Sequence, residues 1–479
     1  MTLRRSFYLS FGRFGGSRLI QFVTSVVLAR LLTPAEIGVF VVALAVIMTL
    51  GALRDFGIPR YLLKEREITE AKLATVFGVS LLFGWSLAAA LYLGRHAAAR
   101  FYGAPELAEI LAVLAVTFLL LPIGQPALGM LRREQRHGQL AVNALGAALG
   151  GSATSITFAV LGFGPISMAY GALVAAVLTS AHALHAEPAH LRLRPSLSEW
   201  RGVLGFGAVA TAGAIVAQLG LNAPALLVGR LMGFAETGLL QRASSVSSII
   251  LAIILNSSSW VTGAAMGARY RADEDISMLA LRTTDYLAVI GWPALVVLAL
   301  KAEAVIYLLY GAAWLPATPL VPPLCIAYGV RVFASQAVAI YDGTGAMGLQ
   351  LRNYFLGLVV AVAFLVIGAQ YSLVVLAWLW IPAMAAQALL HFSALRRYAG
   401  IGVWQMTRAL RRAFLVTAGF TLAFLGMILL EPEGAGRDPV TLLVELIAAG
   451  MIYIALLFAC RHPLRQELAR VAGVLRRFR

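Results

Sequence analysis

A short helical hairpin sequence occurs twice in this 479-residue chain, about 200 residues apart. The stretch 28–38 reads LARLLTPAEIG, and the stretch 228–238 reads VGRLMGFAETG. Arginine, leucine, alanine, glutamate and glycine recur at the same positions in both copies. In each copy an apolar helix ends, a short turn follows and another apolar helix begins. The repeat therefore predicts a chain built from two similar halves.

The composition indicates an integral membrane protein. Hydrophobic residues make up 60% of the chain and charged residues only 13%, with a mean hydropathy of +0.84, whereas soluble domains carry roughly 25% charged residues. The first apolar stretch contains Arg18 and lacks a small-residue cleavage site, so we expect a retained helix rather than a signal peptide. Cys325 and Cys460 both lie in apolar stretches, which disfavours a disulfide framework or a metal site. Two similar halves in a membrane are typical of a transporter whose site lies between them.

Apolar runs of about 20 residues, read against turn signals, predict an all-α protein with about fourteen membrane spans. A very tight turn at Gln370 and Tyr371 is predicted to separate the spans 353–370 and 372–394. An even number of spans places both termini on one side of the membrane. The predicted spans cover 14–32, 37–54, 74–94, 106–124, 140–161, 164–184, 204–228, 239–260, 284–309, 317–340, 353–370, 372–394, 412–430 and 439–460.

The distribution of charge predicts cytoplasmic termini. With the N-terminus in the cytoplasm, 29 of the 38 Lys and Arg residues fall in cytoplasmic segments, five in outer loops and four at membrane depth. This split follows the positive-inside rule and explains most of the net charge of +16 without nucleic acid as a partner. Residues 461–479 form an amphipathic basic tail that suits anionic lipid, although a solvated basic tail is an alternative.

Motifs for catalysis are missing from the sequence. A phosphate-binding P-loop needs a lysine after glycine, and none of Lys64, Lys72 and Lys301 follows a glycine. No His-Glu-x-x-His pair occurs, and the histidines at 182, 185 and 190 read as juxtamembrane groups rather than metal ligands. The outer loops are short, which disfavours catalysis on that face. We therefore expect no enzymatic activity and no cofactor or metal.

Polar residues at membrane depth carry the functional signal, because such groups are costly and tend to face a cavity. We predict that they line a water-accessible cavity between the halves. Their cationic or neutral character favours an anionic cargo, since Arg matches phosphate oxygens well. The candidates for substrate binding are Arg18, Gln21, Arg54, Asp55, Gln218, Asn222, Gln241, Arg242 and Asn256.

Each group of candidates also has a purely structural interpretation. Arg18 could extend to the cytoplasmic interface. Gln218 and Asn222 could form hydrogen bonds between helices. Arg54 and Asp55 could form a local ion pair at the membrane edge.

Several short motifs, in this order and spacing, resemble bacterial polysaccharide flippases of the multidrug/oligosaccharidyl-lipid/polysaccharide exporter superfamily. They are the run at 28–38 with Asp55-Phe-Gly57, Phe101-Tyr-Gly103 with Pro105-Glu106, Leu161-Gly-Phe-Gly164, Val228-Gly-Arg-Leu231, and Leu309-Tyr-Gly311 with Trp314-Leu315. The resemblance covers nearly the whole chain. It implies alternating access that moves a lipid-diphosphate-linked oligosaccharide to the outer leaflet of the bacterial inner membrane. It also implies that Arg18, Arg54 and Arg242 hold the diphosphate.

The resemblance further implies two pseudo-symmetric six-helix lobes of the kind found in multidrug and toxic-compound exporters, followed by two extra helices. The expected segments are an N-terminal lobe at 1–185, a cytoplasmic linker at 186–203, a C-terminal lobe at 204–395, two extra helices at 396–460 and the basic tail at 461–479. Two departures concern the site: Asn222-Ala223 is followed by Pro224 where many relatives have an acid, and Leu240-Gln241 stands where relatives often have Tyr.

The expected partners are the lipid-linked oligosaccharide, anionic membrane lipid and glycan-assembly proteins, with no nucleic acid, and the chain is expected to be a monomer. Transport is expected to couple to the membrane potential or to an ion whose identity stays open. Three alternatives remain. They are a small-molecule exporter of the same fold, a membrane polysaccharide polymerase or ligase, and a scaffold within a glycan-assembly complex.

Overall fold

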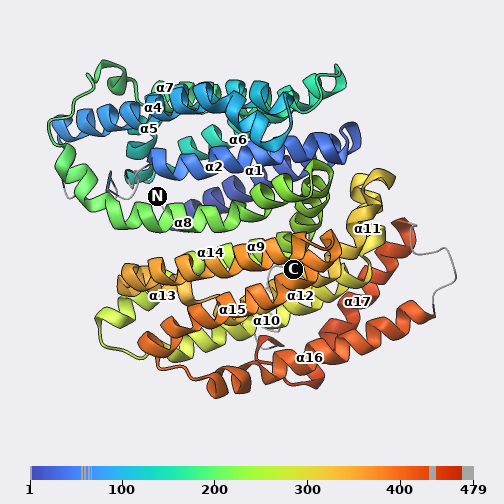
Figure 1. The fold of residues 1–479 in the computed structure, drawn as a ribbon. Coiled ribbons are helices and arrows are strands. Elements are labelled where there is room, and N and C mark those ends of the chain that lie inside the picture. The colour runs from blue at the N-terminus through green and yellow to red at the C-terminus, as the bar shows by residue number, and fades with distance from the viewer. Residues whose placement is uncertain are drawn as a thin grey trace. The chain divides into compact units, whose positions relative to one another are not determined.

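The computed structural model describes residues 3–55, 58, 61–62, 65, 67–430 and 439–465. Side chains are described for these residues except those at 3–15, 55, 191–192, 203–210, 250–261, 264 and 439. The described chain is helical and contains no strand, which confirms the all-α prediction (Figure 1). It forms two compact units, unit 1 at residues 1–239 and unit 2 at residues 240–479.

Unit 1 contains seven long helices and one short 3-10 helix among its described residues, and α9 (Phe234–Arg271) begins at its end. In chain order these are α1 (Leu3–Leu31), α2 (Pro34–Asp55), α4 (Glu70–Tyr102), α5 (Glu106–Arg133), α6 (His137–Val160), α7 (Ile166–Ala186), η1 (Pro188–Arg192) and α8 (Trp200–Leu231).

Unit 2 continues α9 and holds the remaining elements. They are α10 (Ser277–Leu300), α11 (Ala302–Tyr310), η2 (Ala312–Leu320), α12 (Val321–Arg331), η3 (Val332–Ala334), α13 (Ala337–Thr344), α14 (Met347–Ala369), α15 (Leu373–Ala399), α16 (Val403–Leu429) and α17 (Pro439–Ala459).

Eleven of the described helical segments are long and apolar enough to cross a membrane. The chain is therefore a multi-pass membrane protein, and the full count of fourteen spans stays a prediction. The tight turn predicted near Gln370 is confirmed, because α14 ends at Ala369 and α15 begins at Leu373. There Ser372 caps α15, its hydroxyl accepting a hydrogen bond from the Val375 N–H at 3.2 Å.

Two predicted spans coincide with segments long and apolar enough to cross a membrane, Ser277–Leu300 and Ala312–Thr344, but neither is one regular helix over the predicted range. The span 284–309 breaks at Lys301, whose backbone (φ −105°, ψ 25°) leaves the helical region between α10 and α11. This break places the Lys301 ammonium against Glu445, as described below. The span 317–340 divides into η2, α12, η3 and α13. Pro316 and Pro319 lie within η2, where each lacks the N–H that a regular α-helix needs.

The first repeated hairpin is fixed by a reciprocal cap at its turn. The backbone N–H and hydroxyl of Thr33 both donate to Oε2 of Glu36 at 2.8 Å, while the Glu36 N–H donates to the Thr33 hydroxyl at 3.3 Å. This capping box satisfies backbone donors that a helix N-terminus leaves open. In the second hairpin Gly233 takes the place of Thr33 and adopts φ +122°, a conformation that favours glycine.

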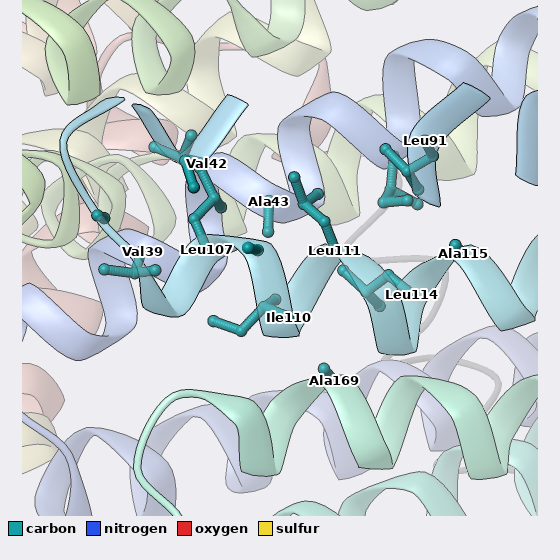
Figure 2. Close-up of a cluster of buried hydrophobic side chains, with 14 of the residues drawn as sticks. Val39, Val42, Ala43, Leu91, Leu107, Ile110, Leu111, Leu114, Ala115 and Ala169 are labelled. Atoms are coloured by element: carbon teal, nitrogen blue, oxygen red, sulfur yellow. The ribbon is translucent and has the colours of Figure 1, made fainter. Parts of the chain in front are cut away.

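The core of unit 1 lies between α2, α4, α5 and α7. Figure 2 shows Val39 and Val42 of α2 beside Leu107 and Leu111 of α5, with Ala169 of α7 beneath. Leu107 and Leu111 are fully buried, as are Val42 and Ala169. Small residues at the helix contacts let these helices approach closely, which is how membrane helices gain packing energy.

The linker expected at 186–203 packs against α4 rather than standing apart. The Ser196 N–H donates to the Ala74 carbonyl oxygen at 3.0 Å. A methyl group at Gly78 would overlap the Ser196 carbonyl oxygen, so the linker backbone touches the helix directly. These contacts attach the start of α8 to α4.

A buried ion pair and a histidine–aspartate contact fasten α17 within unit 2. The Lys301 Nζ lies 2.6 Å from Oε1 of Glu445, and both side chains are almost completely buried. After the end of α17, the His462 Nε2 lies 3.0 Å from Oδ2 of Asp285 on α10. The His462 Nδ1 accepts a hydrogen bond from the Leu464 N–H at 3.2 Å, which holds the imidazole in place. Both ends of α17 are thus tied to α10 or to the residue that follows it.

We expect the Lys301–Glu445 pair to stabilise the native state only while both partners are present. Replacing Lys301 with Met alone leaves the Glu445 carboxylate buried without its cation, at a cost of about 3–5 kcal/mol. The double variant Lys301→Met/Glu445→Leu should recover most of that loss. Thermal unfolding of the purified protein in detergent measures this. Equal stability of the wild type and the single variant would contradict the assignment.

Candidate functional site

The predicted polar face of α1 is exposed. Arg18 and Gln21 lie about one helical turn apart, and both side chains are exposed. α1 packs against α6, where the Thr24 hydroxyl donates to the Ser152 hydroxyl at 2.7 Å. Arg18 and Gln21 are therefore available to a ligand in unit 1.

Asn222 of α8 forms hydrogen bonds with α2. Its Nδ2 donates to the Ala45 carbonyl oxygen at 3.1 Å and to the Thr49 hydroxyl at 3.0 Å. The amide nitrogen of Asn222 thus forms hydrogen bonds between helices, as its structural interpretation expected. Gln218 lies one turn nearer the start of α8 and is half-buried.

Arg54, near the end of α2, is half-buried over an aromatic ring. Its guanidinium carbon lies 5.2 Å from the centre of the Phe118 ring on α5. A cation over such a ring is attracted by the negative ring face. The side chain of Asp55 lies outside the described residues, so the expected ion pair between Arg54 and Asp55 stays a prediction.

Arg242 of α9 is buried in unit 2 beside two neighbouring aromatic rings, those of Tyr310 and Trp314, whose centres lie 6.1 Å apart. Only 7% of its surface is exposed, and its guanidinium carbon lies 5.3 Å from the Tyr310 ring centre and 5.5 Å from that of Trp314. Its Nε has no hydrogen-bond partner among the residues described. The negative ring faces stabilise a cation that is expensive to bury. To bind substrate, Arg242 would have to leave them.

The remaining candidates divide between exposed and undescribed side chains. Gln241, beside Arg242, is exposed, whereas the side chain of Asn256 lies outside the described residues. In unit 1, Asn222 and Arg54 lie on α8 and α2, two helices that pack together. Arg18 and Gln21 lie on α1, which packs on α6 instead.

Sequence reasoning missed the partners of these residues. Thr49 looks like an ordinary membrane-helix threonine, and Phe118 like one of many apolar residues of α5. A signal did exist for Tyr310 and Trp314, because both belong to a recognised motif, but no local pattern linked that motif to Arg242. Lys301 and Glu445 were likewise visible singly, 144 residues apart in the sequence.

We expect Asn222 and Thr49 to be energetically coupled. Asn222→Ala and Thr49→Val each remove one side of the hydrogen bond, so the double variant should lose less stability than the sum of the two. Such pairs contribute about 0.6 kcal/mol on average in membrane proteins and at most ~1.7 kcal/mol. A double-mutant cycle of unfolding in detergent measures this coupling. Strict additivity would show that the bond does not join the helices.

Solved structures of similar fold extend across most of the chain. The lipid II flippase MurJ, in an inward closed conformation, superposes with a TM-score of 0.74 at 14% identity, covering 94% of this chain and 98% of that one. An inward-facing multidrug resistance transporter of the MATE family and MOP superfamily gives 0.64 at 18% identity, covering 82% and 94%. At these identities the likeness establishes the fold.

Curated relatives match over nearly their full length. The succinoglycan biosynthesis transport protein of Rhizobium meliloti is 24% identical over 472 residues, which is 96% of this chain and 93% of that protein. The teichuronic acid biosynthesis protein of Bacillus subtilis is 24% identical over 475 residues, 94% of each. The family model described as "Polysaccharide biosynthesis protein" matches residues 27–319, more than half of the sequence. The chain belongs to this polysaccharide biosynthesis protein family.

Proposed function

We propose that this protein moves a lipid-diphosphate-linked oligosaccharide from the cytoplasmic to the outer leaflet of the bacterial inner membrane by alternating access. The observation that carries the proposal is the family match, joined to a fold shared with a lipid II flippase over 94% of the chain. A relative of nearly equal length is named as a transport protein for succinoglycan. These names describe transport and biosynthesis of polysaccharides rather than catalysis, so we assign no enzymatic activity.

The exposed cation of unit 1 is our first candidate for the diphosphate. An arginine offers several donors in a planar fork that matches phosphate oxygens, and Arg18 presents such a fork to its surroundings. Arg54 is the second candidate, held over Phe118. Arg242 is the third, and it requires movement of its rings. Gln21, Gln218, Gln241 and Asn256 are the candidates for sugar hydroxyls, and Asp55 and the Asn222 oxygen complete the set.

A cation-coupled small-molecule exporter is less well supported. Two acidic residues of the unit 2 helices are already engaged, Asp285 with His462 and Glu445 with Lys301. An exporter that binds cations would be expected to keep a carboxylate available at the site. Coupling to the membrane potential or to an ion remains part of the proposal. So do the cytoplasmic termini, a monomeric state, glycan-assembly proteins as partners, and anionic lipid at the tail 461–479.

Replacing Arg18 with Ala should abolish glycan export while the protein level stays normal, because an exposed side chain contributes little to folding. Arg18→Lys should keep partial export, since it retains the charge but loses the planar fork. Arg100→Ala is the matched control, as this arginine is also exposed but lies near the end of α4 outside the candidate site. Surface glycan and protein abundance are measured in cells. Normal export by Arg18→Ala would exclude Arg18 from the site.

Arg242→Ala should differ from Arg18→Ala in its effect on stability. Removing the Arg242 cation takes away the group that packs against both Tyr310 and Trp314, so we expect a lower unfolding temperature as well as reduced export. Comparing the thermal unfolding of both purified variants separates the two roles. If Arg242→Ala unfolds at the wild-type temperature, the cation held by the rings does not support the fold.

A further inference from the structure

The two repeated hairpins touch at equivalent glycines. Gly38 of α2 lies against the backbone of Phe234, and Gly238 of α9 lies against the backbone of Pro34. Because each residue of one pair is 200 positions from its counterpart in the other, the contact is reciprocal. We call these two contacts the glycine crossing. It lies within unit 1, as do all four residues.

No side chain fits at either glycine. A methyl group on Gly38 would overlap the Phe234 carbonyl oxygen and lie 2.6 Å from the carbonyl carbon. A methyl group on Gly238 would overlap the Pro34 carbonyl oxygen and lie 2.9 Å from its carbon. In each case the obstacle is backbone, which cannot rotate aside as a side chain can. The crossing therefore depends on glycine at both positions.

Further contacts continue from the crossing along α2 and α8. A methyl group on Gly229 of α8 would lie 2.5 Å from Cγ2 of Val42 on α2, so these two helices are also close at a position farther from the turns. The Tyr102 hydroxyl of α4 donates to the Leu226 carbonyl oxygen at 3.3 Å. Deeper still, Asn222 reaches the backbone of α2. The two antiparallel helices are thus joined from their turns inward.

The two hairpins can separate at the glycine crossing without unfolding. The Thr33–Glu36 cap fixes the first turn by itself, and no hydrogen bond between the hairpins is needed to form it. Van der Waals contact between backbones holds the crossing closed, and such contact is lost over a small separation. The turn of the first hairpin can therefore keep its own structure when the two hairpins move apart.

We propose that the glycine crossing is the closed gate at the turn end of α2 and α8, with Gly38 and Gly238 as its positioning residues. This inference rests on the proposed alternating access, in which that end must open to release cargo. A side chain at either position holds the hairpins apart and favours the open state. Because the contact is reciprocal, the two substitutions have the same effect although they lie on different hairpins.

The chain supplies matched controls on the same helices. Gly51 of α2 and Gly220 of α8 both have open space where a Cβ would stand. Gly38→Ala and Gly238→Ala are compared with Gly51→Ala and Gly220→Ala in the full chain, with Cys325 and Cys460 replaced by Ala. Spin labels at Leu31 and Leu231, both exposed beside the turns, report the separation of the hairpins in lipid nanodiscs.

The wild type and both controls should give a short label distance, and both Gly38→Ala and Gly238→Ala should shift it to longer values. An unchanged distance in folded Gly38→Ala and Gly238→Ala would overturn the proposal. The measurement needs no substrate, so it stands apart from the proposed function. If the protein moves no lipid-linked oligosaccharide, that function fails while the label distances still test the crossing.

A second experiment keeps both glycines and so avoids any folding defect. Leu31→Cys and Leu231→Cys are joined in cells by a reducible thiol crosslinker. Crosslinking should stop glycan export, and reduction should restore it, whereas either single cysteine treated alike should export normally. Full export by a crosslinked protein would overturn the gate.

Discussion

The cost of placing charge in a membrane governs this structure. An uncompensated ionisable group at the bilayer centre is expensive, so membrane proteins pair it, cover it or expose it to water. Unit 2 uses the first two solutions: Lys301 pairs with Glu445, and the aromatic rings of Tyr310 and Trp314 cover Arg242. Arg18 in unit 1 differs, because its side chain is exposed. The proposed function gives this exposed cation a negatively charged ligand.

This contrast refines the view of the cationic site. The family resemblance implies the same diphosphate-binding role for Arg18, Arg54 and Arg242. The structure separates them by their surroundings: Arg18 is exposed, Arg54 stacks on Phe118, and Arg242 is enclosed. The repeat aligns Arg18 with Gln218, so the first half carries charge where the second carries an amide. The proposed diphosphate grip therefore lies mainly in the first half.

Much of the architecture could be predicted from local patterns. Apolar runs and turn residues identified the helices, and even the tight turn before Leu373 was found, because periodicity and capping act over a few residues. The contact made at the helix break could not be found this way, since Glu445, the partner of Lys301, lies far along the chain. The hydrogen bond between Asn222 and Thr49 could not be predicted either, because the two residues lie 173 positions apart in the sequence. The hairpin repeat indicated a duplication, but the contact of Gly38 and Gly238 with the opposite hairpins is a feature of the three-dimensional structure.

The central claim is that the protein carries a lipid-linked oligosaccharide across a bilayer. The most direct measurement uses sealed vesicles containing the purified full chain and a lipid-diphosphate oligosaccharide in the inner leaflet. A glycosidase outside the vesicles reports each molecule that reaches the outer leaflet. The account predicts transfer well above that of protein-free vesicles, with Arg18→Ala near the protein-free rate. Transfer by the folded wild-type protein no faster than in protein-free vesicles, at any membrane potential or ion gradient imposed, would contradict it.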